Sequence, residues 1–104
     1  MIIKLKDYKI YKNLILKFIG LRFSKKSKRV LILDFFNESR LNSVIDTIFV
    51  FYPIYVLWLD NKKKVVDIRY VIPFLPFVMP KKKARYVVEF SYKPKIKECD
   101  VLKF

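Results

Sequence analysis

Residues 54–71, IYVLWLDNKKKVVDIRYV, contain two apolar segments separated by a short polar one. Ile54 to Leu59 and Val65 to Val71 are rich in β-branched and aromatic side chains, which favour strands. The polar segment begins with Asp60 and Asn61, and these residue types tolerate the backbone angles of a tight reversal. The pattern therefore predicts a β-hairpin whose first strand is central in a sheet.

Further strands are predicted on both sides of this hairpin. Alternation of apolar and charged residues or density of β-branched side chains predicts them at Ile3 to Lys6, Val30 to Phe36, Val44 to Phe51, Arg85 to Phe90 and Val101 to Phe104. Three prolines between Ile72 and Lys81 prevent regular pairing, so this apolar segment is expected to be an extended edge or a loop over the core.

One helix is predicted near the N-terminus. Ile10, Leu14, Phe18 and Leu21 recur at helical spacing, and Gly20 stands where a left-handed C-terminal cap is needed. The expected fold is therefore mainly β (α+β): a compact β-sandwich or barrel-like domain with this N-terminal helix packed on it. With 104 residues, of which 54% are apolar, we expect a single domain over residues 1–104.

Several protein classes are disfavoured by the sequence. The longest run without a charge, Thr47 to Leu59, is too short to span a bilayer. The N-terminus scatters charges where a signal peptide needs an unbroken apolar stretch. Cys99 is the only cysteine, so neither an internal disulfide nor a cysteine-based zinc site can form within one chain. We therefore expect a cytoplasmic protein.

Catalysis is the least favoured function. The chain has no histidine, and Gly20 is its only glycine, which excludes the usual triads and glycine-rich phosphate loops. No catalytic residue, cofactor or metal site is predicted. Carboxylate catalysis, or a metal held by carboxylates, stays open as an alternative.

The net charge of +14 is the strongest functional signal. Glutamate occurs only three times, so most lysines are expected to lack internal partners. The basic residues form four clusters, and all but part of the last cluster fall in predicted loops or turns: Arg22, Lys25, Lys26, Lys28 and Arg29; Lys62, Lys63 and Lys64; Lys81, Lys82 and Lys83 with Arg85; and Lys93, Lys95 and Lys97. Lysine predominates over arginine, which favours diffuse attraction to phosphates over recognition of base edges.

The leading hypothesis is a non-catalytic, salt-sensitive polyanion-binding domain, with RNA or DNA as the partner. Three alternatives remain. The lysines can reflect compositional bias alone. The apolar Pro-rich segment 72–80 can bind a small molecule or a protein. The same lysines can attach the chain to an anionic membrane surface.

A resemblance to a known family extends over most of the chain. Residues 46–60, DTIFVFYPIYVLWLD, are similar to a motif of the uncharacterised domain-of-unknown-function family 192 (DUF192), and ARYVVE at 84–89 and CDV at 99–101 resemble further motifs in the same order. The matching positions singled out are Asp46, Thr47, Pro53, Tyr55, Asp60, Glu89 and Asp100. The resemblance implies a mainly β domain with one packed helix, and it implies no reaction.

Three positions depart from that family's pattern. Asp46 replaces a histidine, Tyr55 replaces an acid, and Cys99 stands where the family has glycine. Any chemistry that relatives perform with that histidine and acid is therefore not expected here. Structural roles are favoured instead: Asp46 as a turn cap or ion-pair partner, Glu89 in a partly buried ion pair, and Trp58 in the core.

Overall fold

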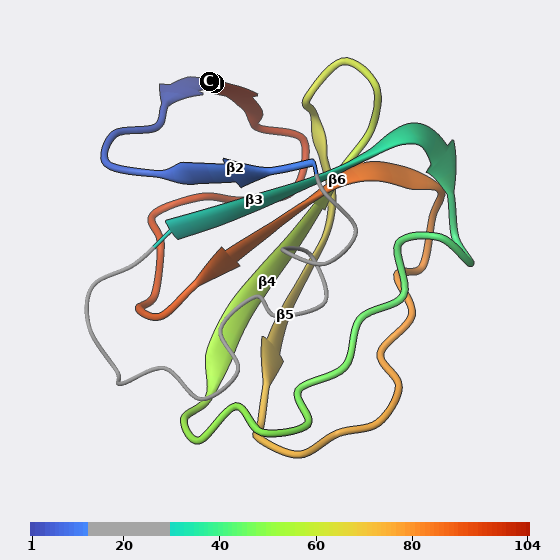
Figure 1. Cartoon of the computed structure of the whole chain (residues 1–104). Helices are drawn as coiled ribbons and strands as arrows, with labels where there is room; N and C mark the ends of the chain where they lie inside the picture. The colour runs from blue at the N-terminus through green and yellow to red at the C-terminus, as the bar shows by residue number, and fades with distance from the viewer. Residues whose placement is uncertain (13–29) are drawn as a thin grey trace.

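The computed structural model describes residues 1–12 and 30–104, and the described chain is all β, with two sheets (Figure 1). The strands are β1 (Ile2–Lys4), β2 (Lys9–Tyr11), β3 (Val30–Ser39), β4 (Ile54–Leu59), β5 (Val65–Val71), β6 (Ala84–Phe90) and β7 (Val101–Lys103). β1 and β7 form a parallel pair, and the other five form a sheet in the order β2-β3-β6-β4-β5.

The five-stranded sheet is antiparallel except at its β2 edge. β2 pairs with β3 in parallel, and the β3–β6, β6–β4 and β4–β5 pairs are all antiparallel. The β4–β5 hairpin predicted from residues 54–71 is confirmed, and Tyr55 lies opposite Tyr70 in its register. The strand predicted from Val30 is three residues longer than expected, because pairing with β6 resumes at Ser39 after an irregularity.

Both faces of this sheet are covered, which explains why its central strands are apolar at nearly every position. On one face Leu31, Val56, Trp58 and Val87 pack beneath the loops that contain Val50 and Val78. On the other face the neighbouring residues of the same strands, which include Ile32, Leu57 and Val88, pack against Leu5 and Leu102 near the β1–β7 pair. Because side chains alternate between the faces of a strand, one sheet supplies both cores.

The predicted fold class is wrong in one respect, because the described residues contain no helix. Ile10 and Tyr11, at the start of the expected helical pattern, belong to β2 instead. The backbone hydrogen bonds that they form with the buried strand β3 outweigh a local helical preference. The rest of the expected helix falls within residues 13–29, outside the described part of the chain.

A second correction concerns residues 44–51, which were expected to form a central strand. Only Ile45 pairs there, in a single bridge to Val78, and the chain then turns at Ile48 and Phe49. Residues 72–80 also form no strand, as the three prolines predicted. These two segments form the apolar loops that cover one face of the sheet.

Candidate functional site

Two of the basic clusters that were predicted to bind a polyanion lie at one end of the sheet, where β4 ends and β6 begins (Figure 1). We call this the lysine end and define it by Lys62, Lys63, Lys64, Lys81, Lys82 and Lys83. The antiparallel register pairs Leu59 of β4 with Tyr86 of β6, so the segments that follow Leu59 and precede Ala84 leave the sheet at the same end. Residues Arg22 to Arg29 of the first basic cluster lie outside the described residues.

Some of the predicted anion-binding residues have internal partners. Arg85 donates two hydrogen bonds to Asp34, at 3.0 and 3.2 Å. Lys81 forms an ion pair with Glu98 at 2.6 Å, and this hydrogen bond raises the pKa of the Lys81 ammonium. Lys63 Nζ donates to the Phe104 carbonyl at 2.8 Å and lies 4.1 Å from the Phe104 ring centroid. The expectation that most lysines lack internal partners therefore does not hold for Lys63 and Lys81, and Arg85 also has an internal partner.

Four lysines of this end are exposed and available to an external anion. Lys62, Lys64, Lys82 and Lys83 are exposed, and none of them forms an ion pair with another residue that the structure describes. Lys62 and Lys64 flank the tight turn, where their backbone N–H groups donate to Asp60 Oδ1 at 2.9 and 3.0 Å. The turn therefore holds two of these lysines in fixed positions along the backbone.

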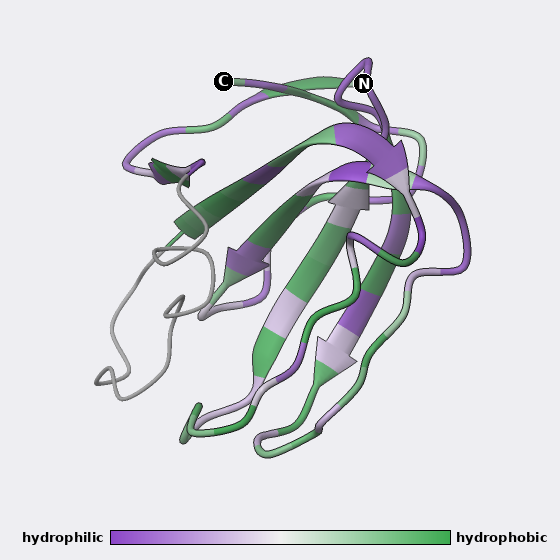
Figure 2. Ribbon diagram, turned by 45° about the vertical axis from the view of Figure 1, so that its right-hand side comes forward, coloured by the Kyte–Doolittle hydropathy of each residue, from purple (hydrophilic) through white to green (hydrophobic). Residues whose placement is uncertain are grey.

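At the opposite end of the sheet, the loops that precede β4 and follow β5 are apolar and aromatic. We call it the aromatic end and define it by Phe49, Phe51, Ile72, Phe74 and Phe77, all of which are exposed. Phe74 lies between Phe49 and Phe51, with ring centroids 6.3 and 5.3 Å away. Figure 2 shows that the loops at this end are mainly hydrophobic, whereas hydrophilic residues gather at the other end.

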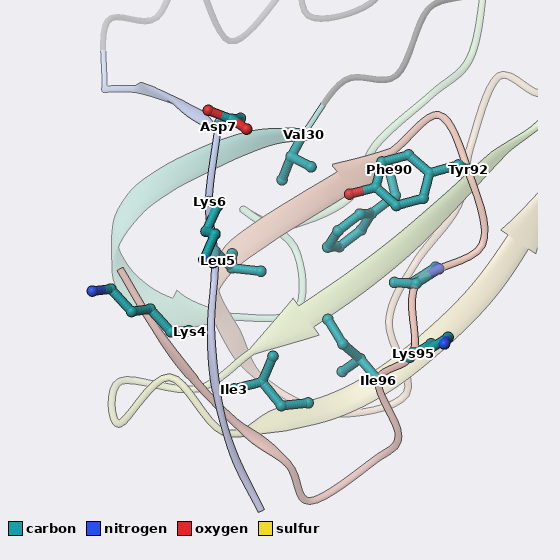
Figure 3. Close-up of a pocket in the computed structure, with 11 residues that line it drawn as sticks. Ile3, Lys4, Leu5, Lys6, Asp7, Val30, Phe90, Tyr92, Lys95 and Ile96 are labelled. Carbon is teal, nitrogen blue, oxygen red and sulfur yellow. The ribbon is translucent and has the colours of Figure 1, made fainter.

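A third feature is a half-open pocket of about 440 Å³ between the N-terminal segment and the segment that follows β6 (Figure 3). Its lining is mixed: the apolar side chains are Ile3, Leu5, Val30, Phe90 and Ile96, and polar groups contribute nearly as much of the exposed surface. Lys4, Lys6 and Lys95 border it, together with Asp7. In Figure 3 the hydroxyl of Tyr92 points toward the cavity, while Lys4 and Lys95 extend away from it on opposite sides.

Neither a metal site nor a spanning helix is present in the described part of the chain. Within residues 1–12 and 30–104, no three His, Cys, Asp or Glu side chains gather closely enough to hold a metal ion. Among the same residues, no helix has the length and hydropathy needed to cross a membrane.

Comparison with curated proteins shows archaeal relatives. The chain is 38% identical over 77 residues to a UPF0127 protein of Pyrococcus furiosus, an alignment that covers 74% of this chain and 65% of the relative. It is 32% identical over 83 residues to a UPF0127 protein of Pyrococcus horikoshii, which covers 80% of this chain and 70% of that protein. The chain belongs to the UPF0127 family. No protein-family model matches it, so the resemblance to DUF192 stays a prediction.

Two solved structures share the fold of this UPF0127 chain. One is a "putative transcription regulator" from Sinorhizobium meliloti, with a TM-score of 0.71, 13% identity and coverage of 78% of this chain and 64% of that one. The other is a protein of unknown function from Novosphingobium aromaticivorans, with a TM-score of 0.67, 11% identity and coverage of 78% of this chain and 59% of that one. At these identities the likeness concerns the fold alone.

In this UPF0127 chain three of the four acids singled out by the DUF192 resemblance, Asp46, Asp60 and Asp100, hold turns. Asp46 Oδ1 accepts a hydrogen bond from the Ile48 N–H at 3.1 Å, as expected for a turn cap. Asp60 holds the hairpin turn, and Asp100 Oδ2 accepts from the Lys97 N–H at 2.9 Å. That backbone hydrogen bond lowers the pKa of the Asp100 carboxyl, and the nearby N-terminal ammonium lowers it further.

Other positions from that resemblance lie in the cores. Glu89 is buried on β6, on the face opposite Tyr86, Val88 and Phe90, as the alternation of the strand predicted. Tyr55 packs on Tyr70 with ring centroids 4.9 Å apart, and Pro53 is half-buried just before β4. Trp58 is fully buried, which confirms its predicted place in the core.

Sequence reasoning missed the pocket and underestimated Thr47. The pocket joins Ile3 and Leu5 to Phe90 and Ile96, and no local pattern predicts contact across such a separation. Thr47 was noted only as a motif position, yet it is fully buried and hydrogen-bonded to the 72–75 segment. The sequence signal for this role was the hydroxyl of Thr47 within a largely apolar run, because a buried hydroxyl needs hydrogen-bond partners.

Proposed function

We propose that this chain is a non-catalytic binding domain and that the pocket beneath its N-terminal segment takes a small amphipathic anion. The observation that supports this proposal is a concave site that several apolar side chains line and that three lysines border. Its volume of about 440 Å³ lies in the range typical of small-molecule sites. A medium-chain carboxylate matches this chemistry, because it has an apolar body and one terminal negative charge.

The walls supply the expected binding energy. Leu5, Val30 and Phe90 are buried by the surrounding chain, so the inner part of the pocket is preorganised, and the half-buried Ile3 and Ile96 offer most of the apolar surface that a ligand's hydrocarbon can cover. Contact with Ile3 and Ile96 removes further apolar surface from water, at roughly 25 cal/mol per Å².

The mouth supplies the preference for an anion. Lys4, Lys6 and Lys95 carry flexible ammonium groups that can turn toward a carboxylate. Asp7 opposes an anion, but three positive charges outnumber it among the lining residues. Each exposed charge contact is worth up to about 1 kcal/mol, so the lysines are expected to select the charge and the walls to provide most of the affinity.

An NMR titration with octanoate tests this function. Backbone amides of Leu5, Val30 and Ile96 are expected to shift saturably, and 1-octanol, which has the same body without the charge, is expected to bind more weakly. The double variant Lys6→Gln/Lys95→Gln is expected to weaken octanoate binding about fivefold. The matched control Lys93→Gln/Lys97→Gln removes the same charge outside the pocket and should leave binding unchanged. Equal binding of octanol and octanoate, or no shift at these amides, would contradict the proposal.

A second candidate is polyanion binding by the lysine end. It is favoured by the position of Lys62, Lys64, Lys82 and Lys83, which leave the same end of the sheet from two segments and form no ion pair within the described residues. Such an arrangement suits phosphates spaced along a nucleic acid backbone, with little sequence preference.

Fluorescence anisotropy with a labelled oligonucleotide tests the second candidate. Log K is expected to fall linearly with log salt, and Lys82→Gln/Lys83→Gln is expected to reduce the slope by about 2. Lys9→Gln/Lys93→Gln is a control that removes the same charge. These two residues lie near the start of β3 and the end of β6, which is the end of the sheet away from the lysine end. Binding that is independent of salt, or that falls equally in both variants, would exclude a defined site at the lysine end.

A further inference from the structure

We propose that the outer edge of β5 binds an extended, acidic peptide segment of another protein as an added strand. β5 is the last strand of the five-stranded sheet, and along its inner edge it pairs with β4 (Figure 1). The outer edge of such a strand presents N–H and C=O groups at alternate residues, and another extended chain can pair with them. Because an added strand is the structure that satisfies this row of donors and acceptors, the edge itself indicates the class of partner.

The protein already adds a short strand of its own to the beginning of this edge. The Val65 N–H donates to the Asp100 carbonyl at 2.8 Å, and the Cys99 N–H donates to the Val65 carbonyl at 2.9 Å. Lys64 and Val101 form an antiparallel bridge beside them. The chain turns at Cys99, which has φ of 74°, so this neighbour ends before it reaches the middle of β5. A partner strand would continue along the same edge from the point where the protein's own strand stops.

The middle of the edge, from Ile68 to Tyr70, is open in the part of the chain that the structure describes. Apart from their pairing with β4, these three residues form no backbone hydrogen bond to any other described residue. Tyr70 is 58% exposed, and Ile68 and Arg69 are half-buried. In β4, which pairs on both sides, five of the six residues are buried. The difference in burial is the one expected of a strand with an unpaired edge.

β5 also lacks the features that usually protect an edge strand. Lysine, proline and β-bulges are the common ones. β5 contains neither lysine nor proline, although the chain has 18 lysines, and its register irregularity lies near Leu59, outside the open part. Its one cation, Arg69, is held against the sheet, with Nη2 3.2 Å from Asp67 Oδ2 and the guanidinium 5.7 Å from the Trp58 ring centroid. A partner backbone can therefore approach the open part.

One face of the open part offers an apolar contact as well. Ile68 and Tyr70 share this face, because side chains alternate along a strand. The Tyr70 ring packs on Tyr55 with centroids 4.9 Å apart, so an aromatic side chain is already positioned beside the edge. Aromatic and β-branched side chains form favourable cross-strand pairs. We therefore expect apolar, β-branched residues at alternate positions of the partner.

Charge favours an acidic partner. The net charge of +14 attracts acidic segments and repels a second copy of this chain. The Lys81 N–H donates to Asp67 Oδ2 at 2.9 Å, so the segment before β6 lies beside β5 just before Ile68. Lys82 and Lys83 follow in that segment, are exposed and form no ion pair with another described residue. A partner strand that extends past Asp67 can pair its acids with these two lysines.

An NMR titration with a blocked nine-residue peptide that alternates valine and glutamate tests the proposal. Backbone amides of Ile68, Arg69 and Tyr70 are expected to shift saturably. Replacing two central valines of the peptide by proline keeps its charge and removes donors, so binding should weaken at least tenfold. Replacing every glutamate by lysine reverses the charge of an equally extended peptide, and this change should also weaken binding at least tenfold.

A pair of protein variants locates the binding site. Tyr70→Glu removes the ring and places a negative charge at the open edge, so it is expected to weaken binding of the valine–glutamate peptide at least tenfold. Ile10→Glu is the matched control, because Ile10 is 41% exposed on β2, at the opposite edge of the same sheet. It makes the same change of net charge, and its affinity should stay within about twofold of the wild type.

Three results would overturn the proposal. The first is equal binding of the proline peptide or of the lysine peptide, because strand pairing or negative charge would then not be needed. The second is an equal loss in Tyr70→Glu and Ile10→Glu, or shifts confined to the lysine end or the pocket, because the peptide would then bind away from β5. The third is a shift of the same β5 amides when the protein alone is concentrated, because a second copy would then occupy the edge.

Discussion

Asp34 and Arg85 form the best-defined charged pair in the described chain, and they connect β3 to β6. Asp34 is buried and accepts two hydrogen bonds from Arg85 and one from the Phe36 N–H at 2.8 Å. Burial raises the pKa of the Asp34 carboxyl, but these hydrogen bonds and the positive charge of Arg85 lower the pKa below its ordinary value. The carboxylate is therefore more stable in the folded than in the unfolded chain.

This pair predicts a loss of stability in acid. Because the pKa is lower in the folded state, the contribution of Asp34 is fully present above the unfolded pKa of about 4 and is lost as the pH falls through the folded value. Asp34→Asn is expected to lower the free energy of unfolding by about 2 kcal/mol at neutral pH, and by progressively less below pH ~4. Urea denaturation followed by Trp58 fluorescence measures both effects. Asp7→Asn, at an exposed acid, is the control, and an equal loss in that variant would contradict the assignment.

Cys99 occupies a position where the sequence already indicated an unusual backbone conformation. It stands where the DUF192 pattern has glycine, and its φ is 74°, a region that glycine occupies without steric cost. Cys99→Gly is therefore expected to keep or slightly raise stability, whereas Cys99→Val should lower it by about 1–2 kcal/mol. Thermal unfolding of the two variants is the measurement. Comparable losses in both would show that the thiol itself contributes.

At the scale of elements, strands were predictable where pairing and composition agreed. Residues 54–71 form a hairpin because Asp60 suits the turn and the apolar residues flanking it pair in register. Residues 44–51 have a similar composition but form a loop, because Thr47 bonds to segment 72–75 and Phe49 leaves the extended region. An apolar, β-branched run indicates that a segment is buried. A loop buried against the face of a sheet and a strand paired within the sheet have the same composition, so composition alone does not distinguish them.

The helix predicted from Ile10 in the N-terminal segment was wrong for a related reason. Its helical spacing from Ile10 was real as a pattern, yet Lys9–Tyr11 pairs in parallel with the buried strand β3. Three residues carry too little local preference to compete with backbone hydrogen bonds to an existing sheet. The positions of such short edge strands depend on tertiary pairing, which one sequence does not display.

Thr47 gives the prediction that belongs to this scale, because it joins two loops. Thr47→Val keeps the shape but removes the hydroxyl, so the Ile72 carbonyl and the Leu75 N–H lose their shared partner. The free energy of unfolding is expected to fall by about 2 kcal/mol. Thr47→Ser retains the hydroxyl and should lose less. Urea denaturation compares them, and a larger loss for serine would mean that the methyl group matters more than the hydrogen bonds.

At the scale of the whole molecule, the sequence predicted the amount of charge better than its arrangement. Loop positions for the basic clusters were correct at Lys62–Lys64 and Lys81–Lys83, but their common location at one end of the sheet follows from strand order. The pocket depends on contacts between residues 3–7 and 90–96, which only the folded chain brings together. Exposed phenylalanines were likewise unpredictable, since each also fits a core.

The excess of positive charge makes a prediction about the entire fold. With a net charge of +14 and only four ion pairs between described residues, repulsion between like charges opposes the compact state more than attraction favours it. Salt at about 0.5 M shortens the screening length to a few ångströms, and the repulsion is then largely removed. The melting temperature is therefore expected to rise by about 5 °C between low salt and 0.5 M NaCl.

A charge-reversal variant separates this effect from a general influence of salt on burial. Lys82→Glu/Lys93→Glu changes two exposed positions and lowers the net charge from +14 to +10, because each reversal removes two charges. It should melt higher than the wild type at low salt and respond less to added salt, since there is less repulsion to screen. Calorimetry across a salt series measures both quantities. A wild-type melting temperature that falls with salt would mean instead that the ion pairs, led by Asp34 with Arg85, outweigh the repulsion among the lysines.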